Sequence, residues 1–294
     1  MVEATVLVRL AFWKMHGLGN DYVVIDNRDQ KIEERSLGDL ARALCKRRFS
    51  VGADGLLLLY KSSVADLKMR IFNPDGTEAE MCGNGIRCIA KYCYENGVVE
   101  KEEMTVETLA GVKSLQLKVR NGEVKSVRVD MGKPSFERRM IPMLGEGVCI
   151  DEKLEVEGET YRITCLSIGN PHCVIFVEDS DGFPVKEVGP RIESHKLFPN
   201  KVNVEFVEAL DRDELKVRVW ERGVGETLAC GTGACAAVAA GVALGIVDRK
   251  CTVRLLGGDL QIEYGESMLV TGPAEKAYEG VVDLEHVLAG HRQC

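Results

Sequence analysis

Hydrophobic positions along this chain follow strand-like patterns in some segments and helix-like patterns in others. Gly55–Tyr60 and Leu67–Phe72 are short apolar-rich runs of the length of buried strands. Residues 105–130 alternate apolar and polar positions around Asn121-Gly122, a dipeptide typical of the type I′ turn of a β-hairpin. Further strands are predicted at 12–15, 22–26, 161–166 and 174–177.

Three segments predict helices. Residues 83–95 and 231–247 each begin with Gly-X-Gly, and Asn96-Gly97 predicts the end of the first of them. Ser36 is a candidate N-cap for a helix that continues to about Arg48. This mixture of strands and helices predicts an α/β (α+β) fold.

One sequence block occurs twice, at a constant offset of 148 residues. Residues 66–85 are DLKMRIFNPDGTEAEMCGNG, and residues 214–233 are ELKVRVWERGVGETLACGTG. Two further blocks repeat in the same order at nearly the same offset: 19–25 with 169–175, and 105–111 with 252–258. The chain is therefore predicted to consist of two homologous halves.

The duplication sets the expected domain organisation. We assign 12–127 to an N-terminal half that a C-terminal strand at 273–294 completes, and 128–272 to a C-terminal half. Residues 1–11 are assigned to a short extension, and the Pro- and Gly-bearing stretch 132–147 is the expected linker. Homologous halves commonly meet at a pseudo-twofold interface, and such clefts are frequent ligand sites.

Composition excludes several classes of function. The net charge is -8 and no basic stripe is present, which argues against nucleic-acid binding. The longest apolar run, 234–247, is too short to span a bilayer, and residues 1–11 do not resemble a signal peptide. The 11 cysteines are odd in number and lie mostly in apolar runs, so we expect free thiols in a reducing, cytoplasmic compartment.

Cys82 and Cys230 are the candidate chemical groups, since they occupy equivalent positions in the repeat and each precedes a predicted helix. The first N–H groups of a helix lack internal acceptors and carry a partial positive charge. A thiol at such a position is expected to have its pKa lowered toward neutrality. A carboxylate can bind the same N–H groups, and adjacent glycines allow it to approach.

Two such sulfurs on opposite faces of one carbon would suit inversion of a stereocentre. A thiolate would remove the Cα proton of an amino acid from one face, and a thiol would deliver a proton to the other face. The charge of the carbanion would spread into the carboxylate, where the N–H dipoles stabilise it. This scheme needs no metal and no cofactor, pyridoxal phosphate included.

Zinc binding and dithiol redox chemistry are the rival interpretations. Five residues separate Cys82 from Cys88 and four separate Cys230 from Cys235, and the histidines are scattered. Zinc sites favour about two to four intervening residues. No Cys-X-X-Cys motif of a redox dithiol occurs. A non-catalytic amino-acid-binding or zinc-binding protein is the alternative from a different class.

Six motifs, in order, resemble those of diaminopimelate epimerases. They are HGLGND at 16–21, FNPDG at 72–76, MCGNGIRC at 81–88, GNPH at 169–172, WERG at 220–223 and ACGTG at 229–233. The resemblance extends from about Phe12 to Tyr278. It implies two similar domains, each a curled, mostly antiparallel sheet around a central helix, with the active site in the cleft between them. It also implies conversion of LL-2,6-diaminopimelate to the meso form, without a cofactor, in lysine and cell-wall precursor biosynthesis.

The resemblance further implies roles for individual residues. Cys82 and Cys230 would be the two bases, with His172 and Glu221 near the reacting centre. Backbone N–H groups of four residues would hold the reacting carboxylate: Gly83, Asn84, Gly231 and Thr232. The distal amino-acid end would be bound by Asn20, Asn73, Asn170, Asn203, Glu221 and Arg222. Tyr278 matches a dimer contact, so a homodimer is expected.

Gly55 departs from the family pattern. Some members of the family place a polar, substrate-contacting residue at this position, and glycine has no side chain for that role. A racemase of another amino acid, such as proline, is the alternative within the same class. Proline racemase-like enzymes share the cysteine pair but lack the HGLGND and ERG context, and proline has no distal amino-acid group to occupy the Asn-rich set.

Overall fold

The computed structural model describes residues 8–291, which divide into two compact units. Unit 1 contains the residues up to Val127 together with those from Pro273 onward, and unit 2 contains Arg128–Gly272. The chain thus leaves unit 1 within a strand, β8 (Glu123–Gly132). The prediction that 132–147 forms the linker was wrong, because this stretch lies within unit 2, where Ile141 and Met143 are buried in the core.

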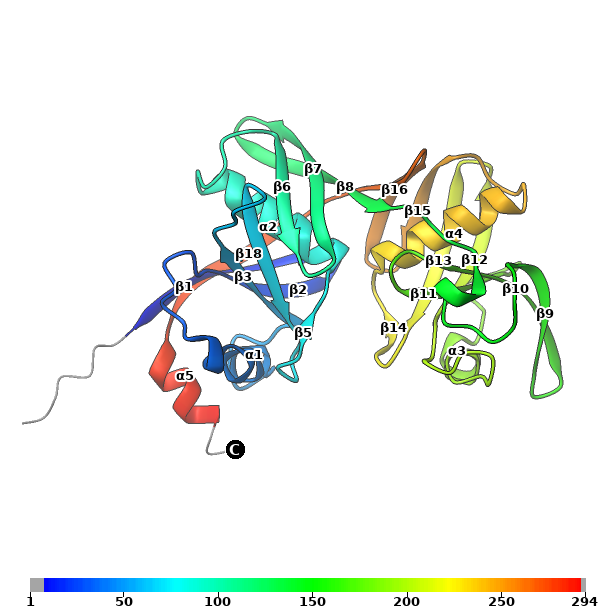
Figure 1. The fold of residues 1–294 in the computed structure, drawn as a ribbon, viewed down its shortest axis with the longest axis horizontal. Coiled ribbons are helices and arrows are strands. Elements are labelled where there is room, and N and C mark those ends of the chain that lie inside the picture. The colour runs from blue at the N-terminus through cyan, green and yellow to red at the C-terminus, as the bar shows by residue number, and fades with distance from the viewer. Residues whose placement is uncertain (1–7, 292–294) are drawn as a thin grey trace, which may run out of the picture. The chain divides into compact units, whose positions relative to one another are not determined.

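Figure 1 labels most of the elements of unit 1. They are β1 (Arg9–Gly17), β2 (Asn20–Asp26), η1 (Glu34–Ser36), α1 (Leu37–Cys45), β3 (Gly55–Tyr60), β4 (Leu67–Phe72), β5 (Glu78–Ala79), α2 (Gly83–Glu95), β6 (Glu103–Thr108), β7 (Gly111–Arg120), the first part of β8, β18 (Glu275–Asp283) and α5 (Leu284–His291). Those of unit 2 are η2 (Arg138–Met140), β9 (Cys149–Val156), β10 (Glu159–Ser167), β11 (Pro171–Phe176), α3 (Val185–Glu193), β12 (Asn203–Asp211), β13 (Glu214–Glu221), β14 (Gly225–Thr227), α4 (Gly231–Ala243), β15 (Lys250–Leu255), β16 (Gly258–Tyr264) and β17 (Met268–Gly272).

The two sheets repeat one pairing pattern. In unit 1 the strands follow the order β18, β1, β2, β3, β4, with β5 and β6 both beside β4 and β7 beside β6. Among these described pairs, only β2–β3 and β4–β6 are parallel. Unit 2 repeats this order from β9 to β16, and its parallel pairs are the equivalent ones, β11–β12 and β13–β15. The predicted α/β (α+β) fold with two homologous halves is therefore confirmed.

Each sheet wraps around one helix. In unit 1, α2 contacts strands from β1 to β7, and in unit 2, α4 contacts strands from β10 to β17. The opposite face of each sheet packs against another helix, α1 or α3. Leu56 and Leu58 belong to the core cluster on the α1 side, whereas the side chain of Leu57 lies against Gly85 of α2. A strand covered on both faces needs apolar residues at successive positions, which explains the run at 55–60.

Most predicted boundaries agree with the structure. β3, β4 and α2 begin and end where predicted, and Asn121 and Gly122 have positive φ angles of 55° and 78°, as a type I′ turn requires. α1 ends three residues earlier than predicted, because Lys46 is already extended. α4 ends at Ala243 instead of 247, because Gly245, two residues later, has a φ of 72° that a helix does not allow. β1 begins at Arg9, before the predicted start of the first half, and residues 1–7 of the predicted extension lie outside the described residues.

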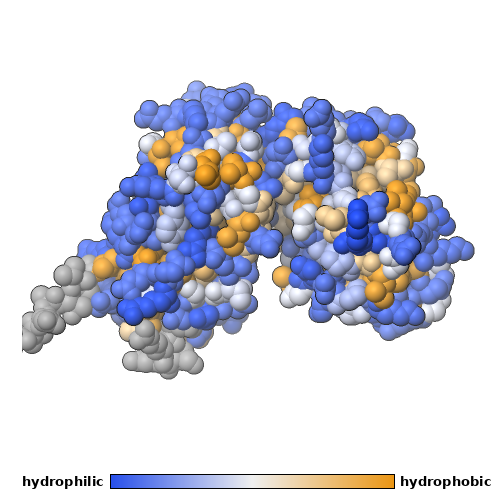
Figure 2. Space-filling view, in the orientation of Figure 1, coloured by the Kyte–Doolittle hydropathy of each residue, from blue (hydrophilic) through white to orange (hydrophobic). Residues whose placement is uncertain are grey.

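The described cysteines are free thiols, and nine of these ten are buried while Cys82 is half-buried. Cys294 lies outside the described residues. Within 8–291 no helix is both long and apolar enough to cross a membrane. Polar side chains cover most of the face shown in Figure 2.

Candidate active site

Cys82 and Cys230 are the N-cap residues of α2 and α4. Both have extended backbone, with φ and ψ of −140° and 125° at Cys82 and of −125° and 111° at Cys230. In unit 2 the sulfur already accepts a hydrogen bond from a helix N–H, that of Gly233, at 3.4 Å. The prediction that each of these cysteines begins a helix is confirmed.

The glycines after the cysteines have two separate purposes. A Cβ on Gly85 would lie 3.1 Å from the side chain of Leu57, and one on Gly233 would lie 2.9 Å from Glu205 Oε1. These glycines allow each helix to pack closely on the strand beneath it. A Cβ on Gly231 would meet no atom within 4 Å, so this glycine leaves open space beside the first N–H groups of α4.

In unit 1 the Cys82 thiol contacts two polar side chains from β2. The Tyr22 hydroxyl lies 2.9 Å from Cys82 Sγ and also hydrogen-bonds to Asn20 Oδ1. Asn84 Nδ2 donates to the same oxygen at 3.1 Å, and Asn20 Nδ2 donates to Asp54 at 3.0 Å. The Asn20 amide is thus held through both its oxygen and its nitrogen, which fixes its orientation beside the sulfur.

A fully buried guanidinium lies beneath the first turn of α2. Arg87 donates to Gly83 O at 2.9 Å, to Asn84 Oδ1 at 2.8 Å and to Pro273 O at 3.1 Å. These three acceptors are neutral, and burial lowers the pKa of Arg87. Its charge adds to the positive potential at this helix N-terminus, which favours a bound carboxylate.

An ion-pair network holds the turn between β1 and β2. Asp21 accepts from Arg47 at 2.5 Å and pairs with Lys14 at 2.7 Å, and Arg47 also contacts Asp54 at 2.8 Å. Burial raises the pKa of Asp21, but the bonds from Arg47 and Lys14 outweigh it and bring the value down to about 2. This network fixes the positions of Asn20 and Asp54 relative to α2.

The Asp21→Asn variant should be less stable by about 1–2 kcal/mol at neutral pH, because it loses the ion pairs that lower the pKa of Asp21 from 3.8 to about 2. The lower part of this range reflects the exposure of Arg47 to solvent, which weakens its ion pair. A depressed carboxyl pKa contributes its full stability above the unfolded value of 3.8 and loses it as the pH falls through about 2. The difference in urea midpoint between variant and wild type should therefore stay constant from about pH 7 to about pH 4 and shrink as the pH falls toward about 2. Asp29→Asn, at an exposed carboxylate 3.7 Å from Lys31, is the matched control. Equal midpoints for Asp21→Asn and wild type at neutral pH would contradict the prediction.

In unit 2 a chain of hydrogen bonds leads from Cys230 into the core. Cys230 Sγ lies 3.4 Å from Thr232 Oγ1, which accepts from Asn170 Nδ2 at 3.2 Å. Asn170 Oδ1 lies 2.9 Å from His172 Nε2, and His172 Nδ1 lies 2.7 Å from Glu205 Oε1. His172 and Glu205 are fully buried. The chain therefore connects the sulfur to a buried carboxyl group through four side-chain contacts.

The pKa of Cys230 is raised, which is the opposite of the prediction from its place at a helix start. Burial is the largest cause, and the charges of Glu221 and Glu205 add to it. The hydrogen bonds from Thr232 and the Gly233 N–H lower the pKa of Cys230 by less. The prediction was wrong for this thiol because desolvation and two carboxylates outweigh the helix N-terminus.

The segment after β13 is fixed by backbone contacts. Asn203 donates to Pro171 O at 2.8 Å and accepts from the Arg222 N–H at 2.9 Å, so it joins the first residue of β11 to this segment. Thr227 donates to Glu221 Oε1 at 2.5 Å. In unit 1, Asn73 donates to Thr77 Oγ1 at 3.0 Å. Roles of these residues in substrate binding stay predictions.

Comparisons with known proteins identify the family of this chain. The profile of the family described as diaminopimelate epimerase matches residues 12–137 and 164–276. The chain belongs to the diaminopimelate epimerase family. It is 56% identical to the diaminopimelate epimerase of Moorella thermoacetica, over 93% of this chain and 99% of that protein. It is 50% identical to that of Methanococcus maripaludis, over 94% of this chain and 100% of that protein.

Solved structures with low identity share the fold. A PhzF-family phenazine biosynthesis protein from Bacillus anthracis matches with a TM-score of 0.68 and 20% identity, over 94% of this chain and 99% of that one. A hydroxyproline epimerase from Agrobacterium vitis matches with a TM-score of 0.67 and 17% identity, over 94% and 93%. Family membership confirms the resemblance that the six motifs indicated.

The predicted epimerase residues form two half-sites, each described within its own unit. Unit 1 brings together Cys82, Asn20, Gly83 and Asn84, with Asn73 on the turn after β4. Unit 2 links Cys230, Thr232, Asn170 and His172 by side-chain hydrogen bonds, and links Asn203 to Arg222. Tyr278 lies on β18, 48% exposed, with its ring edge against Phe12.

Sequence reasoning missed Tyr22, Arg87 and Glu205. Each has apolar neighbours in the sequence, and this pattern predicts a core residue instead of a functional one. The repeat carried a signal for the first of them, because Tyr22 stands at the same position in its half as His172. Applying the 150-residue offset to that position would have identified it.

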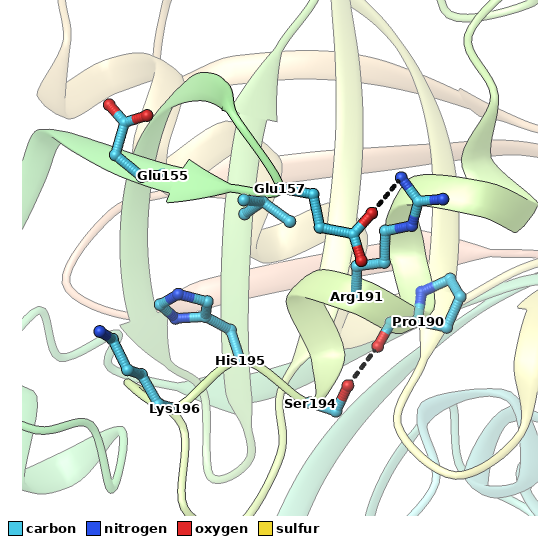
Figure 3. Close-up of a pocket in the computed structure, with 8 residues that line it drawn as sticks. Glu155, Glu157, Pro190, Arg191, Ser194, His195 and Lys196 are labelled. Atoms are coloured by element: carbon cyan, nitrogen blue, oxygen red, sulfur yellow. Dashed lines mark hydrogen bonds and ion pairs between the residues drawn. The ribbon is translucent and has the colours of Figure 1, made fainter.

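The surface hollow drawn in Figure 3 is not a candidate site for this chemistry. It is lined by the end of β9 and the C-terminal part of α3, with Glu155, Glu157, Arg191 and His195 among its residues. Arg191 pairs with Glu157 at 2.9 Å, and burial and the charge of Lys196 lower the pKa of His195. No cysteine lines the hollow, and its charged groups neutralise one another.

The zinc interpretation finds no support in the described part of the chain. Cys88 and Cys235, which it requires as ligands, are fully buried inside α2 and α4. Among residues 8–291 no group of three or more His, Cys, Asp and Glu side chains is arranged to hold a metal ion.

Proposed function

We propose that this chain converts LL-2,6-diaminopimelate to the meso form, with Cys82 and Cys230 as the two bases that exchange the Cα proton. The observation that carries the proposal is the pair of cysteines at the N-caps of equivalent helices in a duplicated fold. The names of relatives at 50–56% identity over more than nine-tenths of this chain support the substrate.

The chemistry follows from what each half-site supplies. The thiolate of one cysteine takes the Cα proton, and the thiol of the other returns a proton to the opposite face. Because burial raises the pKa of Cys230, this thiol keeps its proton at neutral pH and acts as the acid when Cys82 is the base. Backbone N–H groups of Gly83, Asn84, Gly231 and Thr232 hold the carboxylate on which the carbanion charge develops.

The distal amino-acid group would be bound by polar side chains. Arg222 grips the distal carboxylate, and Glu221 takes an ammonium group. The amide side chains complete the set: Asn20, Asn73, Asn170 and Asn203. His172 adjusts the Cys230 half-site through Asn170 and Thr232, and Glu205 holds the imidazole. No cofactor is needed, and a reducing compartment such as the cytoplasm keeps both thiols active.

We infer that the protein acts as a homodimer, with Tyr278 in the contact. β18 pairs with β1 along one edge, and it exposes Tyr278 and Val281, which are 48% and 62% accessible. Sedimentation equilibrium should give twice the 32.4 kDa mass of one chain. A mass of one chain at micromolar concentration would contradict the dimer.

Proton NMR in D2O tests the function directly. The purified protein, reduced and without added cofactor, should remove the Cα–H signal of LL-diaminopimelate while the meso form appears. The same measurement with proline and hydroxyproline distinguishes a racemase of another amino acid. Exchange on proline but not on diaminopimelate would contradict the proposed substrate. No exchange on any of the three amino acids would contradict the proposed activity.

A further inference from the structure

We propose that Tyr22 is a further catalytic residue, whose hydroxyl keeps a hydrogen bond to Cys82 in both protonation states of the thiol. The proposal rests on the two-base function proposed above. Tyr22 is 3% exposed, and its hydroxyl oxygen lies 2.9 Å from the sulfur that would exchange the proton.

The position of the Tyr22 ring depends on Gly55. The two residues are partners in the parallel pair β2–β3, and a Cβ on Gly55 would lie 3.1 Å from a Tyr22 ring carbon. A larger side chain at 55 would therefore compete with the ring for this space. Gly55 is also the position at which the sequence departs from the family pattern, so the phenol takes the space that the missing polar side chain leaves.

The second unit has an equivalent arrangement with different groups. His172 is the counterpart of Tyr22, and its partner across β11–β12 is Asn203, the counterpart of Gly55. Both rings contact the oxygen of the asparagine two residues earlier, Asn20 or Asn170. In unit 2 the ring reaches the sulfur only through Asn170 and Thr232, whereas in unit 1 the phenol contacts the sulfur itself.

One hydroxyl satisfies both states because Asn20 provides a second acceptor. When Cys82 is a thiol, its S–H donates to the Tyr22 oxygen and the Tyr22 O–H donates to Asn20 Oδ1. When Cys82 is a thiolate, the Tyr22 O–H turns to the sulfur, and Asn20 Oδ1 retains its bond from Asn84 at 3.1 Å. The phenol proton never leaves its oxygen, since burial and the neighbouring sulfur raise the pKa of Tyr22 well above its ordinary value.

Charged and titratable groups around this contact come from several elements. Arg87 and Cys88 of α2 face it from the helix, and Asp54 faces it from the segment before β3. Asp54 is bound to Asn20 and Arg47. These groups are unchanged by a substitution that removes only the hydroxyl, so such a variant loses only the contacts of the phenol with Cys82 and Asn20.

The Tyr22→Phe variant tests the proposal. It should lower kcat about 10- to 100-fold, because a hydrogen bond to a charged group is lost at the reacting atom. KM should stay within about twofold, because Asn20 keeps its bonds with Asn84 and Asp54. The pH midpoint for iodoacetamide alkylation of Cys82, followed on its own peptide by mass spectrometry, should rise by about one unit. Replacing Tyr22 by 3-fluorotyrosine, a stronger donor of the same shape, should move the midpoint the other way.

Tyr60→Phe is the matched control, since it removes a hydroxyl that accepts from Asn27 at 2.9 Å in the same unit. It should leave kcat and the Cys82 midpoint unchanged, and the Cys230 midpoint should stay constant in every variant. Unchanged kcat and an unchanged Cys82 midpoint in Tyr22→Phe would overturn the proposal. Failure of the two-base function would instead appear as absent Cα-proton exchange in the wild-type protein. The alkylation midpoint of Cys82 would still show whether the Tyr22 hydroxyl acts on the sulfur.

Discussion

Alanine at either Cys82 or Cys230 should lower turnover of LL-diaminopimelate by at least about 10³-fold while leaving the protein folded. Each variant removes one of the two groups that we propose to exchange the proton, and a positioned acid or base contributes about 10²–10⁴-fold on its own. Conversion followed by NMR gives the rate, and the thermal unfolding midpoint reports the fold.

The chain supplies a matched control for each of these variants. Cys88 lies in α2 and Cys235 lies in α4, both are fully buried, and neither is at a helix N-cap. Cys88→Ala and Cys235→Ala make the same chemical change, so we expect them to keep most of their activity and to lose about 1 kcal/mol of stability from the smaller side chain.

A finer result distinguishes two bases from one base with a passive partner. In Cys230→Ala the Cys82 thiolate can still remove a proton and return a deuteron to the same face. The variant should therefore slowly exchange the Cα–H of one stereoisomer for deuterium, without inversion. Cys82→Ala should do the same for the other stereoisomer. Full activity in either alanine variant, or exchange of the same stereoisomer in both, would contradict the two-base assignment.

The duplication is the part of the fold that the sequence predicts best. Sequence matches at offsets near 148 residues identify Cys82 and Cys230 as equivalent, and the strand pairings of both units repeat accordingly. Segments with two strong signals, such as an apolar run closed by Asn96-Gly97, have the predicted boundaries. The end of α4 was predicted four residues late, because Val247 is apolar and buried but packs on the helix from outside, against Gly241.

The electrostatics of the Cys230 half-site could not be predicted from local sequence. A helix N-terminus is visible in the sequence, and it lowers a thiol pKa. The opposing groups come from β12 and β13, and only the folded sheet brings Glu205 and Glu221 near the sulfur. Burial, which is the largest cause, likewise depends on the packing of the whole unit.

The Glu205→Gln substitution should give the second large effect, about a 10- to 100-fold lower kcat with little change in KM. The imidazole of His172 lies between two acceptor oxygens, with Nδ1 2.7 Å from Glu205 Oε1 and Nε2 2.9 Å from Asn170 Oδ1. Glutamine keeps the size of the side chain but replaces one carboxylate oxygen by an NH2 group, so the contacts of the imidazole with residue 205 and with Asn170 must rearrange. Asn170 must then turn, and its bond to Thr232 beside the sulfur is lost.

The same variant has an electrostatic consequence that a merely loosened core would not produce. The charge of Glu205 raises the pKa of Cys230, so removing that charge should lower it. The pH midpoint for alkylation of Cys230 should therefore fall in Glu205→Gln even as the rate of epimerisation falls. Glu208→Gln, on the same strand but bonded to Ser180, should change neither quantity. A normal kcat together with an unchanged Cys230 midpoint would show that the buried His172–Glu205 pair does not act on the sulfur, and that its role is confined to joining β11 to β12.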